Sequence, residues 1–126
     1  MPAPDELARR IDVIERGYEY LLAYAAQGRQ NEMGSEARQT LAGMYAALEG
    51  FAGLLGAAVK GAGAGGEADS AGFVEAIEDD ARKARGAIGL VLSRPAISSL
   101  LVDNLNASIH LRALLTDVFL AEQALK

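Results

Sequence analysis

Hydrophobic residues recur along most of the chain at alternating steps of three and four positions, the spacing that places side chains on one face of an α-helix. No window alternates apolar and polar residues over the length of a strand, and only 14 of the 126 residues are the β-branched Val, Ile or Thr. The pattern predicts a single all-α domain, residues 1–126, with helices over residues 5–27, 35–60, 70–93 and 95–125. Because short connections link these segments, we expect an antiparallel four-helix bundle.

The first and third predicted helices each carry one regular apolar stripe, and we expect both stripes to face the core. Pro4 suits the first turn of the first helix, where its missing N–H would be unpaired in any case. The third helix should end just before Pro95, because proline disfavours the α conformation in the residue before it. The stripes consist of Leu7, Ile11, Ile14, Tyr18, Leu21 and Ala25, and of Val74, Ile77, Ala81, Ala84, Ile88 and Val91.

The second and fourth predicted helices have apolar residues on more than one face. Beside its large residues the second helix has a seam of small ones, which would let another backbone approach closely. The fourth helix, with Pro95 in its first turn, has a second apolar row. The seam consists of Gly43, Ala47, Gly50 and Ala57, and the row of Leu101, Leu105, Ile109, Leu115 and Phe119. Alternatively, the third and fourth helices form one long element broken at Pro95, which would leave apolar surface open for a partner.

Three of the four tyrosines lie within seven residues of the first helix. Tyr18 belongs to the core stripe, whereas Tyr20 and Tyr24 share another face. Aromatic side chains with a hydroxyl group are common at protein interfaces, because the ring is apolar while the hydroxyl can meet water. Tyr20 and Tyr24 are therefore candidates for a partner or dimer surface, with ordinary packing at the edge of the core as the alternative.

The composition excludes several classes of function. Cysteine is absent, which removes disulfides, thiolate metal sites and cysteine nucleophiles, and His110 is the only histidine. A net charge of −5 without a run of Lys or Arg disfavours nucleic acid as a partner. Glu78 and Asp79 are expected to pair with Arg82 and Lys83 along a helix rather than to bind a metal. We expect no metal and no cofactor.

The sequence also predicts where the protein resides. The N-terminal segment is charged from Asp5 onward and lacks the apolar region of a secretory signal. The longest apolar run, residues 51–59, is much shorter than the roughly 20 residues of a membrane span. These features predict a cytoplasmic protein without a membrane span.

Residues 61–66, GAGAGG, have the G-x-G-x-x-G spacing of a dinucleotide-binding loop. Such a loop works when a strand precedes it and a helix follows it, so that free N–H groups point at the pyrophosphate. Here the preceding residues are rich in Leu, Ala and Gly and predict a helix. We interpret the string as part of a flexible loop, residues 61–69, between the second and third helices.

The segments LARRIDVIER and LLTDVFLAEQALK resemble the first and last helices of the all-α chorismate mutases, a family of helical dimers that rearrange a dicarboxylate. The resemblance implies that Glu122 stands where that family places a Gln or Glu that binds the ether oxygen of the substrate. The substrate-binding arginines of the family align with Ala8 and Ala25 of this chain. The cations that remain for an anionic ligand are Arg9, Arg10, Arg16 and Arg112.

Hydrophobic residues make up 51% of the chain and cover more than one face of two helices, which exceeds what a single bundle core requires. We therefore predict a non-enzymatic protein–protein interaction module, a homodimer that acts as an adaptor for a protein client or as a regulatory or structural subunit. The alternative is a bundle that binds a small molecule or a mutase-like enzyme. The predicted interface residues are Tyr20, Tyr24, Gly43, Ala47, Gly50, Leu101, Leu105, Ile109 and Phe119, and the alternative ligand-binding residues are Arg9, Arg16, Arg112 and Glu122.

Overall fold

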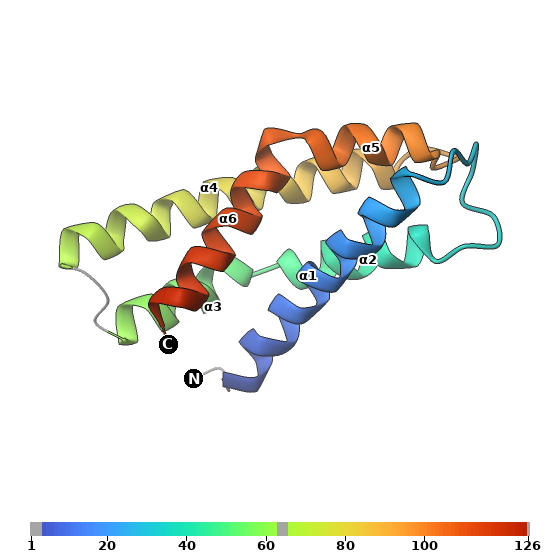
Figure 1. Cartoon of the computed structure of the whole chain (residues 1–126). Coiled ribbons are helices and arrows are strands. Elements are labelled where there is room, and N and C mark those ends of the chain that lie inside the picture. Colours follow the sequence, from blue (N-terminus) through green and yellow to red (C-terminus); the bar gives the residue numbers. More distant parts are fainter. Residues whose placement is uncertain (1–3, 63–65, 126) are drawn as a thin grey trace.

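The computed structural model describes residues 4–62 and 66–125, and over these residues it contains six α-helices and no strand (Figure 1). The helices are α1 (Pro4–Ala25), α2 (Ala37–Leu48), α3 (Phe51–Gly61), α4 (Glu67–Leu92), α5 (Ser99–Ala107) and α6 (Ile109–Ala124). The predicted all-α class is confirmed. The predicted count of four helices is wrong, because the second and fourth predicted helices are each broken into two.

The first break lies at Glu49 and Gly50, where the prediction had a continuous helix over residues 35–60. Gly50 has a φ of +70°, the left-handed conformation that a residue without a Cβ adopts easily and that commonly ends a helix. Helices α2 and α3 are bent by 50° at this point. Gly50 is therefore a helix-ending residue rather than part of a continuous seam of small residues.

Two arginines from neighbouring helices bind the carbonyl groups at the end of α2. The Arg10 guanidinium, from α1, donates to the carbonyl oxygens of Ala47, at 3.3 Å, and Glu49. Arg85, from α4, donates to the Tyr45 carbonyl at 3.3 Å and lies 3.8 Å from the centre of the Tyr45 ring. The last carbonyls of a helix lack partners within the helix, so these two arginines stabilise a helix end inside the fold.

The second break lies at Ser108, which is extended and follows α5 directly. Its Oγ accepts a hydrogen bond from the Leu111 N–H at 3.3 Å, and Ser98 does the same for Leu101 at 3.1 Å. Serine at these positions favours the start of a helix, because its side chain binds an N–H that has no partner within the helix. Pro95 lies before α5, outside any helix, so its predicted place in the first turn of a helix is wrong.

Helix α4 is the central element and packs against α2, α3, α5 and α6, while α1 packs mainly against α2 and α5. After α4 the chain turns back, and α5 lies beside α4 with α6 crossing it further along (Figure 1). The segment around Pro95 is thus a reversal, and the alternative of one long element broken at this proline is wrong. Folding back lets α6 bury its apolar side against α4.

The predicted core stripes of α1 and α4 face the interior. All six residues of the α4 stripe are buried, and in α1 the residues Ile11, Ile14 and Leu21 are buried while Leu7, Tyr18 and Ala25 are half-buried and packed against the core. The large residues of α2 and α3 join the same core despite the break between the two helices. They are Leu41, Met44, Leu48, Phe51 and Leu55.

A set of polar contacts, which we call the junction, joins the end of α1 to the segments 26–36 and 93–99. The Tyr24 hydroxyl donates to the Ile97 carbonyl at 2.6 Å, and Ser99 Oγ donates to the Tyr24 carbonyl at 2.7 Å. Glu32 accepts from the Ile97 N–H at 2.9 Å, and its pKa is lowered, first by this backbone hydrogen bond and then by the nearby Arg38. The junction therefore fixes where the chain reverses between α4 and α5.

Arg38 extends the junction to the end of α4. Its guanidinium donates to the carbonyls of Leu92, at 3.0 Å, and Arg94, at 2.9 Å, and forms an ion pair with Glu32 at 2.8 Å. On the other side, Asn106 from α5 donates to the Leu21 carbonyl near the end of α1 at 3.0 Å. The last turns of α1, α2 and α4 thus all have carbonyls bound by side chains from distant parts of the chain.

The predicted loop over residues 61–69 is shorter in the structure. Helix α3 includes Gly61, and α4 begins at Glu67, so residues 67–69 are helical. The centre of the GAGAGG string, residues 63–65, lies outside the described residues. No single helix of the described chain is long and apolar enough to cross a membrane, although α2 and α3 together reach that length and composition.

Two glycines inside α4 offer a test of local stability. A Cβ added at Gly72 or Gly86 would meet no atom within 4 Å, and neither glycine has a positive φ. Gly72→Ala and Gly86→Ala together should raise the free energy of unfolding by about 1–2 kcal/mol, since alanine loses less backbone entropy in a helix. Urea denaturation monitored by circular dichroism measures this change. The matched substitution Gly50→Ala should lower stability by about 1–2 kcal/mol, because its φ disfavours a residue with a Cβ.

Candidate functional site

The two tyrosines predicted for an interface have different surroundings. Their rings are stacked, with centroids 6.2 Å apart and an angle of 17° between the planes. Tyr24 is fully buried and its hydroxyl is used in the junction, so Tyr24 belongs to the core rather than to the surface. Tyr20 is half-buried, and its hydroxyl accepts a hydrogen bond from the Glu36 N–H at 3.0 Å.

The small residues of α2 and α3 do not form one continuous surface. Ala47 is buried at 8% exposure, whereas Gly50, at the bend between the helices, and Ala57 of α3 are exposed. Gly43 is half-buried, and a Cβ at this position would meet Val13 of α1 at 3.9 Å. The seam therefore serves close contact between α1 and α2 at Gly43 and contributes little to a common external face.

Tyr20 and Gly43 line a groove between α1 and α2 that has a volume of about 480 Å³ and is open to solvent. The groove also contains Arg16, whose guanidinium forms an ion pair with Asp12 at 2.9 Å. The other lining residues are Asp12, Val13, Gly17, Glu36, Gln39 and Thr40. The lining combines two acidic side chains, one arginine and a few apolar and uncharged polar groups. It therefore does not indicate one class of ligand.

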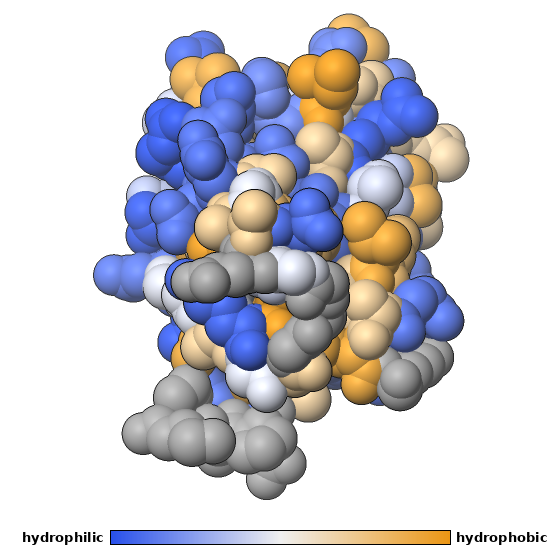
Figure 2. Space-filling view, turned by 90° about the vertical axis from the view of Figure 1, so that its left-hand side faces the viewer, coloured by the Kyte–Doolittle hydropathy of each residue, from blue (hydrophilic) through white to orange (hydrophobic). Residues whose placement is uncertain are grey.

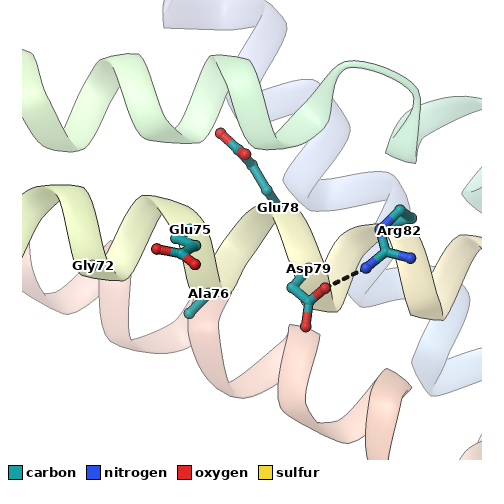
Figure 3. A pocket seen from close by; sticks show the side chains of 6 residues that line it. All are labelled: Gly72, Glu75, Ala76, Glu78, Asp79 and Arg82. Carbon is teal, nitrogen blue, oxygen red and sulfur yellow. Dashed lines mark hydrogen bonds and ion pairs between the residues drawn. The ribbon is translucent and has the colours of Figure 1, made fainter.

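A second groove, of about 620 Å³, runs over the outer face of α4 (Figure 3). Its carboxylates diverge, and Asp79 forms ion pairs with Arg82 and, at 3.0 Å, with Lys83. The predicted pairing of Asp79 with Lys83 is confirmed, while Arg82 pairs with Asp79 rather than with Glu78. These ion pairs lower the pKa of Asp79, Lys83 first and Arg82 second. The described residues contain no group of three or more acidic or histidine side chains that could hold a metal.

The four interface residues predicted on the fourth helix lie on both sides of the break at Ser108. Leu105 is buried at 5% exposure and Leu101 is half-buried, so both contribute to the core of this chain. Ile109 is 73% exposed and Phe119 is 50% exposed. Leu115, the remaining member of the predicted row, is buried at 3% exposure, so on α6 the row divides between the core and the surface.

Helix α6 has a row of residues on its outer face that the sequence analysis did not identify as one unit. Ile109, Ala113, Thr116 and Leu120 follow each other at steps of four, three and four, and Leu120 is 58% exposed. We call these four residues the α6 outer row. Its two large members stand at the ends, the two small members stand in the middle, and Phe119 flanks the row.

Exposed hydrophobic side chains elsewhere on the molecule are more isolated. Figure 2 shows the end of the molecule that lies on the left in Figure 1, where hydrophilic side chains cover one side of the view and hydrophobic ones gather on the other. Met33, Leu90 and Leu100 are exposed but belong to three different segments of the chain. Single exposed apolar residues are common in soluble domains, whereas a periodic row on one helix marks a candidate contact surface.

The residues of the ligand-binding alternative do not lie in one groove. Arg16 lines the groove between α1 and α2, while Arg9 forms an ion pair with Glu6 at 2.7 Å and Arg112 is exposed on α6. Arg10, also considered as an anion-binding group, is used at the end of α2. Glu122 faces another carboxyl group instead of a cation.

Two carboxyl groups have a raised pKa that is caused in part by a carboxyl group on another helix, and neither pair was found in the sequence analysis. Glu15 of α1 meets Glu122, and burial together with this second carboxyl raises the pKa of Glu15 to about 7. Asp80 of α4 meets Asp117, and burial together with Asp80 raises the pKa of Asp117 to about 7. Each pair comes from helices far apart in sequence, so helix periodicity alone cannot reveal it.

The comparisons with known proteins identify no relative. No protein-family model matches the sequence, and neither a curated protein nor a solved structure is significantly similar to it. The resemblance to chorismate mutases therefore remains a prediction based on two short segments.

Proposed function

We propose that this protein acts through protein–protein contact, as a homodimer that serves as an adaptor or as a regulatory or structural subunit. The observation that carries the proposal is the α6 outer row, in which Ile109 and Leu120 are exposed apolar residues at the two ends, Thr116 is exposed and Ala113 is half-buried, on a helix whose other side is already packed on α4. A row with alternating steps of four and three is the spacing by which two helices pack side by side.

The order of residue sizes in the row supports pairing of α6 with α6 of a second copy. In a two-fold dimer both copies use the same surface. If residue i of one copy contacts residue j of the other, then residue j of the first copy contacts residue i of the second. Antiparallel pairing centred between Ala113 and Thr116 would place Ile109 of each copy against Leu120 of the other. The small residues at the centre would let the two helices approach closely, and Phe119 would cover one edge.

The proposal is tested by measuring the molecular mass in solution over about 1–100 µM protein by sedimentation or light scattering. The wild-type chain should be a dimer in this range. The double substitution Ile109→Glu with Leu120→Glu should weaken dimerisation by at least about a hundredfold, because it replaces the apolar contacts at both ends of the row by two acidic side chains that face each other. Its circular dichroism spectrum should stay close to that of the wild type, since both side chains are exposed in the single chain.

A matched control introduces the same two charges away from the row. Met33→Glu with Leu90→Glu replaces residues that are 78% and 69% exposed and should leave the dimer intact. A wild-type chain that is monomeric at every concentration in this range would refute the homodimer. Equal weakening by both double variants would show that net charge, rather than the α6 outer row, governs self-association.

A further inference from the structure

Arg112, on the outer side of α6, is a cation without a partner in its own chain. It is exposed, and within the described part of the chain its guanidinium forms no ion pair or hydrogen bond. Arginines on α1, α2 and α4 are instead paired with Glu or Asp side chains. An arginine combines a long apolar stem with a planar cation, so a free one beside an apolar row is suited to pack on an aromatic ring of a partner.

Phe119 lies on the same flank of the α6 outer row as Arg112. Each of the two follows a member of the row by three positions, Arg112 after Ile109 and Phe119 after Thr116. The ring is 50% exposed, so part of it is left for another contact. Arg112 and Phe119 of one chain are two helical turns, about 10.5 Å, apart, which is more than the three or four positions that join neighbouring side chains on a helix.

A two-fold pair of antiparallel α6 helices brings the two residues together across the interface. In such a pair each flank of one helix meets the same flank of the other. With the pairing centred between Ala113 and Thr116, Arg112 of one copy lies only about 3 Å along the helix axis from Phe119 of the second copy. The two Arg112 residues are then about 7.5 Å apart along the axis, so their charges are less close to each other than each is to a ring.

A parallel pair would join opposite flanks and would bring Arg112 near Asp117 of the second copy, five positions further along. Asp117 is half-buried, and its Oδ2 atom is buried without a hydrogen-bond donor among the described residues. One oxygen of this carboxyl group is thus unavailable to a second copy. In the same arrangement Phe119 would meet the methyl group of Ala124 instead of a cation. The side chains on the flanks of the row therefore favour the antiparallel pair.

We propose that Arg112 determines the orientation of the dimer: its guanidinium packs on the Phe119 ring of the second copy, twice by symmetry, and only when the two α6 helices are antiparallel. This inference rests on the proposed homodimer and adds the direction in which the two copies bind and the residue that selects it. A contact made in one arrangement and absent from the other gives specificity as a difference in affinity.

Cysteine cross-linking measures the orientation directly, because the chain has no cysteine of its own. Under mild oxidation Thr116→Cys should form a disulfide-linked dimer, since its two copies lie about 4.5 Å apart along the axis. Ile109→Cys alone should not, since its copies lie about 16 Å apart, whereas an equimolar mixture of Ile109→Cys and Leu120→Cys should form the mixed disulfide. Met33→Cys, an exposed position away from α6, gives the background of random collisions. Non-reducing electrophoresis measures each product.

The outcomes separate this inference from the proposed function. Cross-linking of Ile109→Cys to itself above the background would show a parallel pair and would overturn the inference while leaving the homodimer in place. A dimer in sedimentation without any cross-link above background would place the contact outside α6 and would overturn it as well. A wild-type chain that is monomeric throughout would refute the homodimer itself.

A double-mutant cycle tests the contact between the cation and the ring. Arg112→Ala and Phe119→Leu should each weaken dimerisation about tenfold, because each removes both symmetric contacts. The double variant should be about as weak as either single one, since the two substitutions remove the same interaction. Arg94→Ala removes an exposed arginine outside α6 and should leave the dissociation constant unchanged. Fully additive effects, or no effect of Arg112→Ala, would contradict the proposed role of Arg112.

Discussion

Tyr24→Ala should lower the free energy of unfolding by about 3–5 kcal/mol, the largest loss that we expect from a single substitution in this protein. Tyr24 is fully buried at the end of α1, and its removal would leave a cavity next to Tyr20. It would also remove the hydroxyl that donates to the Ile97 carbonyl. Because Ile97 belongs to the segment that reverses the chain, the loss should loosen the packing of α5 on α1.

Urea denaturation of Tyr24→Ala and Tyr24→Phe separates these contributions. The phenylalanine variant keeps the ring and loses only the hydrogen bond, so it should cost about 1–2 kcal/mol. Tyr20→Phe provides the matched control, since Tyr20 is only half-buried and its hydroxyl bonds to an exposed N–H; it should cost less than about 1 kcal/mol. A loss below about 1 kcal/mol for Tyr24→Ala would contradict the burial of this residue.

Glu32→Ala should lower the free energy of unfolding by about 2–4 kcal/mol, the second large effect. The carboxylate of Glu32 accepts from the N–H of the buried residue Ile97 and pairs with Arg38, whose guanidinium binds the end of α4. Removing it leaves a partly buried N–H without this partner, and hydrogen bonds to charged groups contribute more than neutral ones. Glu32→Gln keeps an acceptor for the N–H but not the charge, and should lie between the wild type and the alanine variant.

The contribution of Glu32 should also depend on pH in a defined direction. Its pKa is lowered below the ordinary value of 4.5, so its stabilisation is present above that pH and is lost as the pH falls through the folded-state pKa. The difference in stability between wild type and Glu32→Gln should therefore shrink when urea denaturation is repeated at decreasing pH below about 4.5. A difference that stays constant down to about pH 2 would show that the charge of Glu32 is not what matters.

Glu32 and Arg38 illustrate why the sequence analysis missed the junction. Neither residue belongs to an apolar stripe, and the groups they bind are backbone atoms more than 50 positions away along the chain. Backbone carbonyls at helix ends are present in every sequence, so their partners are visible only after the helices have been placed. Arg10 was likewise considered for an anionic ligand because of its charge, but in the structure it binds backbone carbonyls at the end of α2.

The breaks at Gly50 and Ser108 had recognisable local signals. Gly50 is a glycine, the residue type that most often ends a helix. Ser108 is a serine directly before Ile109, and serine is common just before the first residue of a helix. Periodicity hid both signals, because apolar residues recur at helical spacing from α2 into α3 and from α5 into α6. The change of buried face between α5 and α6 is not visible when only the spacing of apolar residues is considered.

The predicted interface residues are also divided between the surface and the core of the chain. Of the predicted interface residues, Ile109 and Phe119 are exposed, whereas Tyr24, Ala47 and Leu105 are part of the core of this chain. A row of apolar residues indicates that a surface will be covered, but it does not indicate whether the same chain or another covers it. That choice depends on how the bends orient α6, which no local pattern specifies.

The sequence by itself determined the all-α class, the buried stripes of α1 and α4, and the absence of cysteine chemistry, because helix periodicity and composition are local properties of the chain. The tertiary structure decided where two helices break, which arginines bind helix ends, which apolar residues of α6 remain on the surface, and which carboxyl groups meet. These features depend on contacts between residues far apart in the chain, and such contacts are set by the packing of all helices together.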